Sequence, residues 1–401
     1  MAKIAVLGYG VVGSGVVEVI HKNGRTIAGK TRADLEVKYI LTRRDYPGDP
    51  FEELIVKDFS VIENDPEITI VAECIGGCGA ALEYVRRALK SGKSVVTSNK
   101  ELIAEHGCEL LSLAKERNLN LLFEASVGGG IPILRPLNQC LAANELTEVY
   151  GILNGTTNYI LTKMIRHGLP FDEVLKDAQQ KGYAEADPTA DIEGFDACRK
   201  ICILAALSFG KHVYPRQVKT VGITQITAED IAFASAAGMR VKLLGRAMLN
   251  EEGKLIIYVA PHLMDEENQL ANVEDVFNAI IVKGDAIGDV MFYGKGAGKL
   301  PTASAVVADV IDASKHAESR KYIHWVDGND DYVADADAYP MRWFVRAAMT
   351  EDEARAKFGK ITVIPHQTEG QIGFITEPVS RYGINAASEG CEVLSVISVL
   401  D

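Results

Sequence analysis

A short apolar run followed at once by a glycine-rich turn, at the start of the chain, constrains the fold more than any other feature. Residues 3–7 read KIAVL, which predicts a buried strand of a parallel sheet. GYGVVG follows at residues 8–13, and residues 14–21 are predicted to form a helix. A strand, G-x-G-x-x-G and a helix in this order predict a dinucleotide-binding domain; an ordinary turn is the alternative.

Each glycine of this turn has a role in that prediction. Gly8 permits the tight turn, Gly10 lets the backbone approach a pyrophosphate, and Gly13 lets the helix pack close to the strand. The helix N-terminus offers its N–H groups and the positive end of its dipole to the phosphates. The predicted cofactor contacts at the turn are Gly8, Gly10, Val11, Val12 and Gly13.

The end of the second predicted strand, residues 35–41, bears on the choice of cofactor. A site that prefers NAD usually has an acidic residue there to bind the ribose 2′-hydroxyl. Here the strand runs into Thr42-Arg43-Arg44, with no acid until Asp45. Because arginine pairs with a 2′-phosphate, we predict that Arg43 favours NADP(H) over NAD(H); the alternative is a solvated basic loop.

Later strands of this domain lead into segments that are suited to ligands. Residues 94–97 are a predicted strand that runs into Lys100, and ligands of open α/β sheets lie beyond the carboxyl ends of the strands. Lys100 is therefore a candidate to meet cofactor or substrate. The predicted strand at 120–124 leads into EASVGGGI at 124–131, whose carbonyls and carboxylate suit a hard cation; the alternative is a hinge between domains.

The alternation of strands and helices stops after Pro132. A helix predicted from Tyr159 and strand-like segments indicate a mixed sheet that carries helices. A second glycine-rich turn at 294–298 precedes a helix predicted at 305–317, so Gly298 is a candidate cofactor contact or part of a hinge. The strand-like segments are residues 147–153, 254–259 and 279–282.

A lysine stands among acids in residues 182–200, GYAEADPTADIEGFDACRK. Residues 195–207 predict a largely buried helix on which Asp196 and Lys200, four residues apart, share a face. Such a buried lysine beside carboxylates could move a proton. The alternative is a surface ion pair that contributes only about 0.3–0.5 kcal/mol.

The chain resembles the homoserine dehydrogenase family up to about residue 318. The segments that carry the resemblance are GYGVVGSGV at 8–16, SNK at 98–100, ILNGTTNYIL at 152–161 and the run at 182–200. The resemblance implies NAD(P)H-dependent interconversion of L-homoserine and L-aspartate 4-semialdehyde in threonine and methionine biosynthesis. Two alternatives are a related dehydrogenase of another amino-acid semialdehyde and a non-catalytic protein that senses the cofactor.

The resemblance also implies roles for individual residues. The catalytic lysines that it implies are Lys200, the proton donor and acceptor, and Lys100, which also faces NADPH. The substrate ligands that it implies are Glu185 and Asp196, with Asp191, Thr156 and Tyr183 alongside. Gly182 is implied to meet the cofactor. The sodium ligands that it implies are Glu124 and the carbonyls of Val127, Gly129 and Ile131.

The predicted fold class is α/β: a Rossmann-type dinucleotide-binding domain, a mixed α/β catalytic domain and a small C-terminal α+β module that weakly resembles the family's ACT regulatory domain. The predicted boundaries are residues 1–130, completed by about 299–318; 131–298 for substrate binding and dimerisation; and 319–401 for a linker and the module. The Pro-Gly turn usual in such modules is replaced here by Met349-Thr350-Glu351-Asp352, so regulation by threonine stays open.

Composition excludes several classes of protein. The net charge of −13 argues against general binding of nucleic acid or anionic membranes, and no apolar run reaches the roughly 18 residues of a membrane span. The seven scattered cysteines form no C-x-x-C pair, so we expect neither zinc nor disulfides. With no signal peptide expected at the start, this indicates a cytoplasmic protein. The resemblance implies a homodimer or homotetramer.

Overall fold

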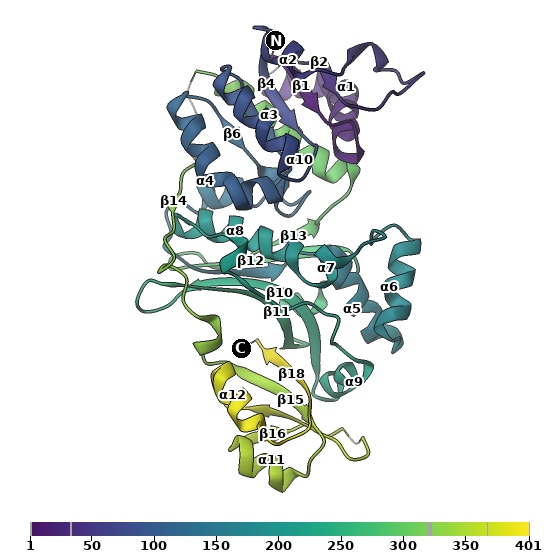
Figure 1. The fold of residues 1–401 in the computed structure, drawn as a ribbon, viewed down its shortest axis with the longest axis vertical. Helices are drawn as coiled ribbons and strands as arrows, with labels where there is room; N and C mark the ends of the chain where they lie inside the picture. The colour runs from purple at the N-terminus through teal and green to yellow at the C-terminus, as the bar shows by residue number, and fades with distance from the viewer. Residues whose placement is uncertain (1, 33, 319–322, 367, 401) are drawn as a thin grey trace. The chain divides into compact units, whose positions relative to one another are not determined.

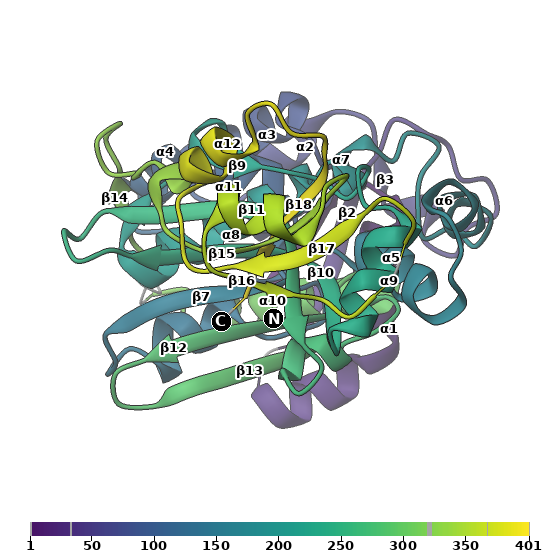
Figure 2. The same cartoon turned by 90° about the horizontal axis from the view of Figure 1, so that it is seen from below.

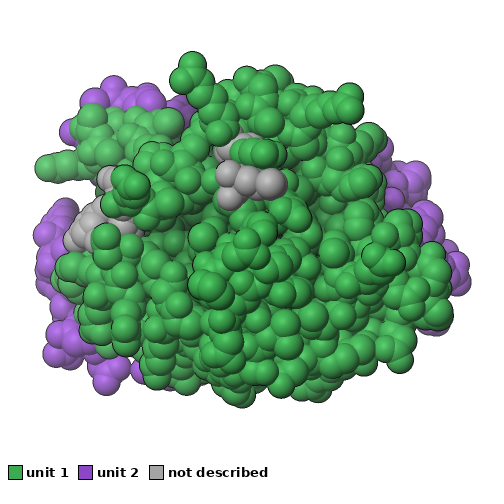
Figure 3. All heavy atoms as spheres, turned by 90° about the horizontal axis from the view of Figure 1, so that it is seen from above, with its two compact units in different colours: residues 1–146, 202–215, 294–328 green, residues 147–201, 216–293, 329–401 purple. Residues whose placement is uncertain are grey.

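The chain forms two compact units, which Figure 3 shows in different colours, and each unit is built from three separate stretches of the sequence. Unit 1 comprises residues 1–146, 202–215 and 294–328, and unit 2 comprises residues 147–201, 216–293 and 329–401. The three predicted domains, with boundaries near residues 130, 298 and 318, are not the same division as these two compact units and stay a prediction. The computed structural model describes residues 2–32, 34–318, 323–366 and 368–400, so the first part of the predicted linker, 319–322, lies outside the described residues.

Unit 1 is built on a parallel sheet whose first strand lies in its middle. The strand order reverses between β1 and β4, which is where open α/β sheets bind their ligands. This order confirms the predicted Rossmann-type sheet. Across the sheet the described strands are β3 (Ile55–Val56), β2 (Leu35–Leu41), β1 (Ala2–Leu7), β4 (Ile68–Glu73), β5 (Ser94–Thr97) and β6 (Leu121–Leu122).

Helices cover the faces of this sheet (Figure 1). Helix α1 (Val11–Thr31) packs against α10 (Lys299–Lys315), although the two are far apart in the sequence. Gly15 permits this contact, because a Cβ there would lie 2.9 Å from the carbonyl oxygen of Lys299. The remaining described elements of unit 1 include α2 (Phe59–Glu63), α3 (Gly79–Lys90), α4 (Lys100–Glu116) and the paired strands β8 (Lys211–His212) and β14 (Val326–Asp327).

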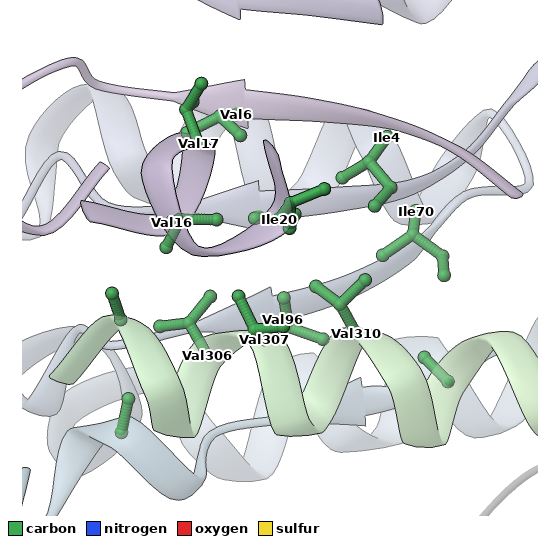
Figure 4. Packing of buried hydrophobic residues seen from close by; sticks show 14 of the residues in the cluster. Ile4, Val6, Val16, Val17, Ile20, Ile70, Val96, Val306, Val307 and Val310 are labelled. Atoms are coloured by element: carbon green, nitrogen blue, oxygen red, sulfur yellow. The ribbon is translucent and has the colours of Figure 1, made fainter. Parts of the chain in front are cut away.

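Branched aliphatic side chains fill the space between these helices and the sheet (Figure 4). Val16 and Ile20 of α1, Ile4 of β1 and Val306 and Val310 of α10 are all buried. Fully burying side chains of this kind contributes about 1.5–3 kcal/mol each. The core of the nucleotide-binding sheet thus depends on a helix that the chain supplies only after residue 298.

Several predicted boundaries in unit 1 are wrong. Helix α1 begins three residues before the predicted start and runs on to Thr31, and α10 begins at Lys299 rather than at 305. In both cases the residue that caps the helix is a glycine, Gly10 or Gly298, which the sequence pattern assigns to the turn. Strand β6 is shorter than 120–124, because Glu124 begins a 3₁₀ turn.

Unit 2 is built on a mixed sheet, as predicted. Strands β10 and β11 pair antiparallel along their whole length, whereas β11 and β18 pair parallel. Figure 2 shows β7, β12 and β13 side by side. Across the sheet the strands are β13 (Gly288–Lys295), β12 (Phe277–Gly284), β7 (Leu146–Ile152), β10 (Met239–Leu249), β11 (Leu255–Asp265), β18 (Val393–Val399), β15 (Arg342–Ala347), β17 (Ile372–Thr376) and β16 (Ile361–Val363), with β9 (Lys219–Thr220) beside β11.

The helix that carries the predicted proton donor, Lys200, has its residues 195–201 in unit 2 and its later residues in unit 1. Helix α8 (Phe195–Phe209) confirms the helix predicted at 195–207. Helix α5 (Gly155–His167) begins four residues before the predicted start, because Asn154 caps it. Among the described residues no helix has the length and apolarity of a membrane span. The other helices of unit 2 are α6 (Phe171–Gln180), α7 (Thr189–Ile192), α9 (Ala228–Ala236), α11 (Glu351–Phe358) and α12 (Arg381–Ser388).

The C-terminal segment of unit 2 has the element order β15-α11-β16-β17-α12-β18, and its neighbouring strands are antiparallel. In place of a Pro-Gly turn, Thr350 caps α11: its hydroxyl accepts the N–H of Glu353, and the Glu353 carboxylate accepts the N–H of Thr350. Since β18 pairs with β11, this segment continues the sheet that β7 belongs to.

Candidate active site

A buried ion pair lies in the first turns of α8. The Nζ of Lys200 donates to Oδ2 of Asp196 at 2.6 Å and to the carbonyl oxygen of Leu153 at 2.7 Å. The side chains of Lys200 and Asp196 are only 9% and 4% exposed, so this is not the surface pair of the alternative interpretation. The chain enters α8 through Gly194, whose φ of +83° suits a glycine.

Asn154 joins this ion pair to a second carboxylate. It lies two residues after the end of β7 and caps α5, because its Oδ1 accepts the N–H of Thr157 at 2.8 Å. Its Nδ2 donates to Oδ1 of Asp191 at 2.7 Å and to Oδ2 of Asp196 at 2.8 Å. Both amide protons are therefore used, and the asparagine fixes the two carboxylates relative to α5.

The electrostatics of this cluster favour a cationic ligand. Burial, followed by the negative charge of Asp196, raises the pKa of Asp191. Asp191 and Asp196 share the amide of Asn154, while Lys200 pairs with Asp196. Two carboxylates against one ammonium leave a net negative site when all three groups are ionised, which suits the ammonium group of an amino acid.

A loop bearing three more of the predicted residues is tied to α5. The hydroxyl of Thr156 donates to the carbonyl oxygen of Tyr183 at 2.7 Å, and the ring of Tyr183 lies 4.9 Å from that of Tyr159. Gly182, which precedes Tyr183, has a φ of +73°, in the left-handed region that favours glycine. Glu185 is exposed, and within the described residues no hydrogen bond or ion pair joins its side chain to the cluster around Lys200.

The glycine turn after β1 has the geometry that its sequence predicts. Gly8 has a φ of +91°, and a Cβ there would lie 2.9 Å from the carbonyl oxygen of Cys74 at the end of β4. A Cβ on Gly13 would lie 1.8 Å from the carbonyl oxygen of Gly8. A Cβ on Gly10 would meet no protein atom within 4 Å, and the neighbouring Val11 is 68% exposed, so this part of the turn faces open space.

Polar groups gather at the carboxyl ends of β4 and β5. The buried carboxylate of Glu73 accepts the N–H of Ile75 at 2.6 Å and the hydroxyl of Thr97 at 2.5 Å, and burial raises its pKa. Asn99 donates to the carbonyl oxygen of Gly77 at 2.7 Å and caps α4. Lys100 is the first residue of that helix, at the strand end where the sequence places it.

The basic loop after β2 presents Arg43 to solvent. Its neighbours are held in place: Lys57 donates to the carbonyl oxygen of Arg44 at 2.7 Å and pairs with Asp45 at 2.7 Å. Asp45, the acid closest in sequence to Arg43, is therefore paired with Lys57.

The predicted cation loop has its carboxylate occupied. Glu124 accepts the backbone N–H groups of Ile133, Leu134 and Arg135 at 2.6, 2.8 and 2.7 Å. The carboxylate thus caps a helical turn, which leaves carbonyl oxygens as the principal cation ligands that the loop offers. Among the described residues no three His, Cys, Asp or Glu side chains are grouped to hold a metal ion.

The two glycine-rich segments of unit 1 contact each other. The N–H of Gly130 donates to the carbonyl oxygen of Lys295 at 3.0 Å. A Cβ on Gly129 would lie 2.4 Å from the carbonyl oxygen of Gly296. Gly298 then caps α10 with a φ of +125°. The sequence pattern indicated each segment separately but not their contact, since 165 residues separate Gly130 from Lys295.

Comparisons with known proteins show which family the chain is similar to. A family model for the homoserine dehydrogenase NAD-binding domain matches residues 8–124, and one for homoserine dehydrogenase matches residues 132–311. A homoserine dehydrogenase of Bacillus subtilis is 44% identical over 318 residues, which are 78% of this chain and 73% of that relative.

Two solved structures extend the comparison. A homoserine dehydrogenase from Thiobacillus denitrificans has a TM-score of 0.89 at 36% identity, over 100% of this chain and 98% of its own. A hyperthermophilic archaeal homoserine dehydrogenase in complex with NADPH has a TM-score of 0.66 at 28% identity, over 81% of this chain and 99% of its own.

Proposed function

We propose, since the chain belongs to the homoserine dehydrogenase family, that Lys200 is the proton donor and acceptor of its reaction. The chain is an NAD(P)-dependent oxidoreductase that interconverts L-homoserine and L-aspartate 4-semialdehyde. The observation that supports the role of Lys200 is its burial in contact with Asp196 and the carbonyl oxygen of Leu153.

Reduction of the aldehyde needs a hydride at carbon and a proton at oxygen. The nicotinamide cofactor, when bound, supplies the hydride. The ammonium of Lys200 donates its proton to the oxygen that gains the electron pair, and in the oxidative direction the neutral amine accepts the hydroxyl proton. Asp196 and Leu153 hold Nζ in place, so little reorganisation is needed when the proton moves.

The carboxylates around Lys200 hold the substrate in this proposal. Asp196 and Glu185 bind the ammonium group of homoserine, with Asp191, Thr156 and Tyr183 alongside. The hydrogen bonds of Asn154 to both aspartates, and of Thr156 to the loop that carries Glu185, support this placement.

In unit 1, the glycine turn (Gly8, Gly10, Val11, Val12 and Gly13) binds the cofactor's pyrophosphate. Gly182 and Gly298 meet the cofactor as well, and Lys100, at the end of β5, is the second active-site lysine. The exposed Arg43, and the NADPH complex of the archaeal relative, support a preference for NADP(H) over NAD(H).

The remaining proposals concern sodium, the C-terminal segment and assembly. A sodium ion at residues 124–131 is held mainly by the carbonyls of Val127, Gly129 and Ile131, with Glu124 shaping the loop. The element order of the C-terminal segment supports an ACT-like regulatory module. We further propose a cytoplasmic homodimer or homotetramer that binds no nucleic acid.

The test follows the absorbance of the reduced nicotinamide with L-aspartate 4-semialdehyde, using NADPH and NADH in parallel. Lys200→Ala should abolish turnover in both directions while NADPH still binds, because it removes the proton donor without touching the glycine turn. Lys360→Ala, at an exposed lysine that pairs with Glu377, is the matched control and should keep its rate. A near-normal kcat for Lys200→Ala would remove Lys200 from this role.

A further inference from the structure

A cavity of about 240 Å³ lies within unit 2, between β11 and the C-terminal segment. Its walls come from elements that are far apart in the sequence: Val259 of β11, Trp343 of β15, Arg381 of α12 and Ile397 of β18. None of these residues belongs to the cluster around Lys200 or to the predicted cofactor contacts. The cavity therefore has no part in the reaction proposed above.

The cavity is lined by a partly buried cation, the guanidinium of Arg381. Arg381 lies over the ring of Trp343, with its guanidinium carbon 5.1 Å from the ring centroid, and burial lowers its pKa. Within the described residues its side chain makes no hydrogen bond and no ion pair. The negative charge of Asp337, which also lines the cavity, acts against this lowering of the pKa, but its carboxylate is paired with Lys219. A guanidinium that is partly removed from water is ordinarily paired with an anion, because desolvation is otherwise uncompensated.

The other polar groups at this cavity already have partners. The hydroxyl of Ser398 donates to the carbonyl oxygen of Pro261 at 2.8 Å, and the hydroxyl of Tyr258 contacts the sulfur of Met341 at 3.4 Å. Lys219 and Asp337, which pair with each other, also line the cavity, and the remaining lining residues are apolar, as with Val259. The chemistry that the cavity offers is thus the guanidinium fork of Arg381 and the Lys219–Asp337 ion pair beside an apolar surface, a combination of a few polar groups with apolar walls that is common in small-molecule sites.

We propose that this cavity binds a small monocarboxylate whose body is apolar. The carboxylate pairs with the guanidinium of Arg381, whose planar donors match its two oxygens. The apolar body packs against Trp343 and the aliphatic side chains of β11 and β18.

The test compares two probes of nearly equal shape on the full-length protein. Isovalerate carries the carboxylate, and isovaleramide replaces it with a neutral amide. The fluorescence of Trp343, one of the chain's two tryptophans, reports binding because its ring lines the cavity. Arg381→Met keeps the length of the side chain and removes its charge. Tyr382→Phe is the matched control, since Tyr382 is exposed and donates to Asp335 instead.

Isovalerate should change the fluorescence of the native protein saturably at millimolar concentrations. Isovaleramide, and isovalerate with Arg381→Met, should bind at least about tenfold more weakly, a loss of about 1.4 kcal/mol. Tyr382→Phe should bind as the native protein does, and all variants should keep their NADPH-dependent turnover. Equal binding of the two probes to the native protein would overturn the proposal without any variant. The proposal would also be overturned if Arg381→Met left the isovalerate titration unchanged. It would be overturned as well if isovalerate changed the association of subunits instead of binding in the cavity.

Discussion

At the scale of single residues, the turn after β1 contains glycines that are required for two different reasons. Gly13 is required by the protein itself, since a Cβ there would collide with the carbonyl oxygen of Gly8 at 1.8 Å. Gly10 is not, because a Cβ there would meet no protein atom within 4 Å. Its backbone has a φ of −84°, which alanine also adopts. The absence of a side chain at Gly10 therefore serves the ligand and not the fold.

The variants Gly10→Ala and Gly13→Ala should separate these reasons. Gly10→Ala should leave the free energy of unfolding within about 0.5 kcal/mol of the native value and raise the KM for NADPH about tenfold. Gly13→Ala should lower the free energy of unfolding by about 1–3 kcal/mol, because the turn must shift. Urea unfolding and initial rates measure the two effects. Equal losses of stability in both variants would refute the distinction.

Asn154 should position the carboxylates of the active site as well as cap α5. Asn154→Ser keeps an oxygen for the cap but removes the amide protons that Asp191 and Asp196 accept. Since hydrogen bonds to charged groups contribute about 1.5–3 kcal/mol, kcat/KM for homoserine should fall about tenfold or more, with the KM for NADPH unchanged. A normal kcat/KM in this variant would mean that Asn154 acts only as a helix cap.

The active-site residues differ in how far the sequence could reveal them. Asp196 and Lys200 are four residues apart on one helix, so their contact followed from helical spacing. The link from Asn154 to Asp191 and Asp196 joins positions 37 and 42 residues apart, and no local pattern predicts it. An asparagine between a strand and a helix signals a cap, but the destination of its amide protons depends on the tertiary fold.

At the scale of elements, whether a strand could be predicted from the sequence depended on the pattern of polar and apolar residues along it. Strand β2 alternates and was predicted with its observed bounds. Strand β10, MRVKLLGRAML, was not predicted, because polar and apolar residues alternate only over residues 239–243 and the buried run that follows shows no such alternation. Strand β13 was also missed, and here glycines at both ends weaken the pattern.

The contact between the two glycine-rich segments should be sensitive to one methyl group. Gly129 has a φ of +52°, and a Cβ there would lie 2.4 Å from the carbonyl oxygen of Gly296. Gly129→Ala should therefore cost the strain of the left-handed backbone, about 1–2 kcal/mol, and about 1–3 kcal/mol more for the collision. Gly48→Ala is the matched control, because Gly48 also has a positive φ but no atom within 4 Å. Similar thermal unfolding of the two variants would contradict a tight contact.

At the scale of the whole molecule, the pairing of β11 with β18 has consequences for stability in acid. His262 of β11 lies fully buried beside this pair, and its ring stacks on that of Tyr258. Burial, followed by the charge of Arg246, lowers the pKa of His262 to about 3. The unfolded chain binds this proton near pH 6.5, so between these values the unfolded state binds more protons than the folded state.

The free energy of unfolding should therefore fall as the pH falls from about 6.5, by up to about 1.4 kcal/mol per pH unit from this group. His262→Phe keeps the stacked ring and removes the titration, so its stability should fall less between about pH 6.5 and about pH 4.5. His167→Phe, at an exposed position of α5, should follow the native curve. Parallel curves for native protein and His262→Phe in urea titrations would rule out this cause.

The packing of α10 against α1 has a consequence for how the protein is made. A ribosome releases the strands β1 to β6 long before it releases Lys299–Lys315. During that interval the apolar faces formed by Val16, Val17 and Ile20 lack the helix that will cover them. Because exposed apolar surface on incomplete chains promotes aggregation, the nascent nucleotide-binding unit should require chaperone protection until about three quarters of the polypeptide has been synthesised.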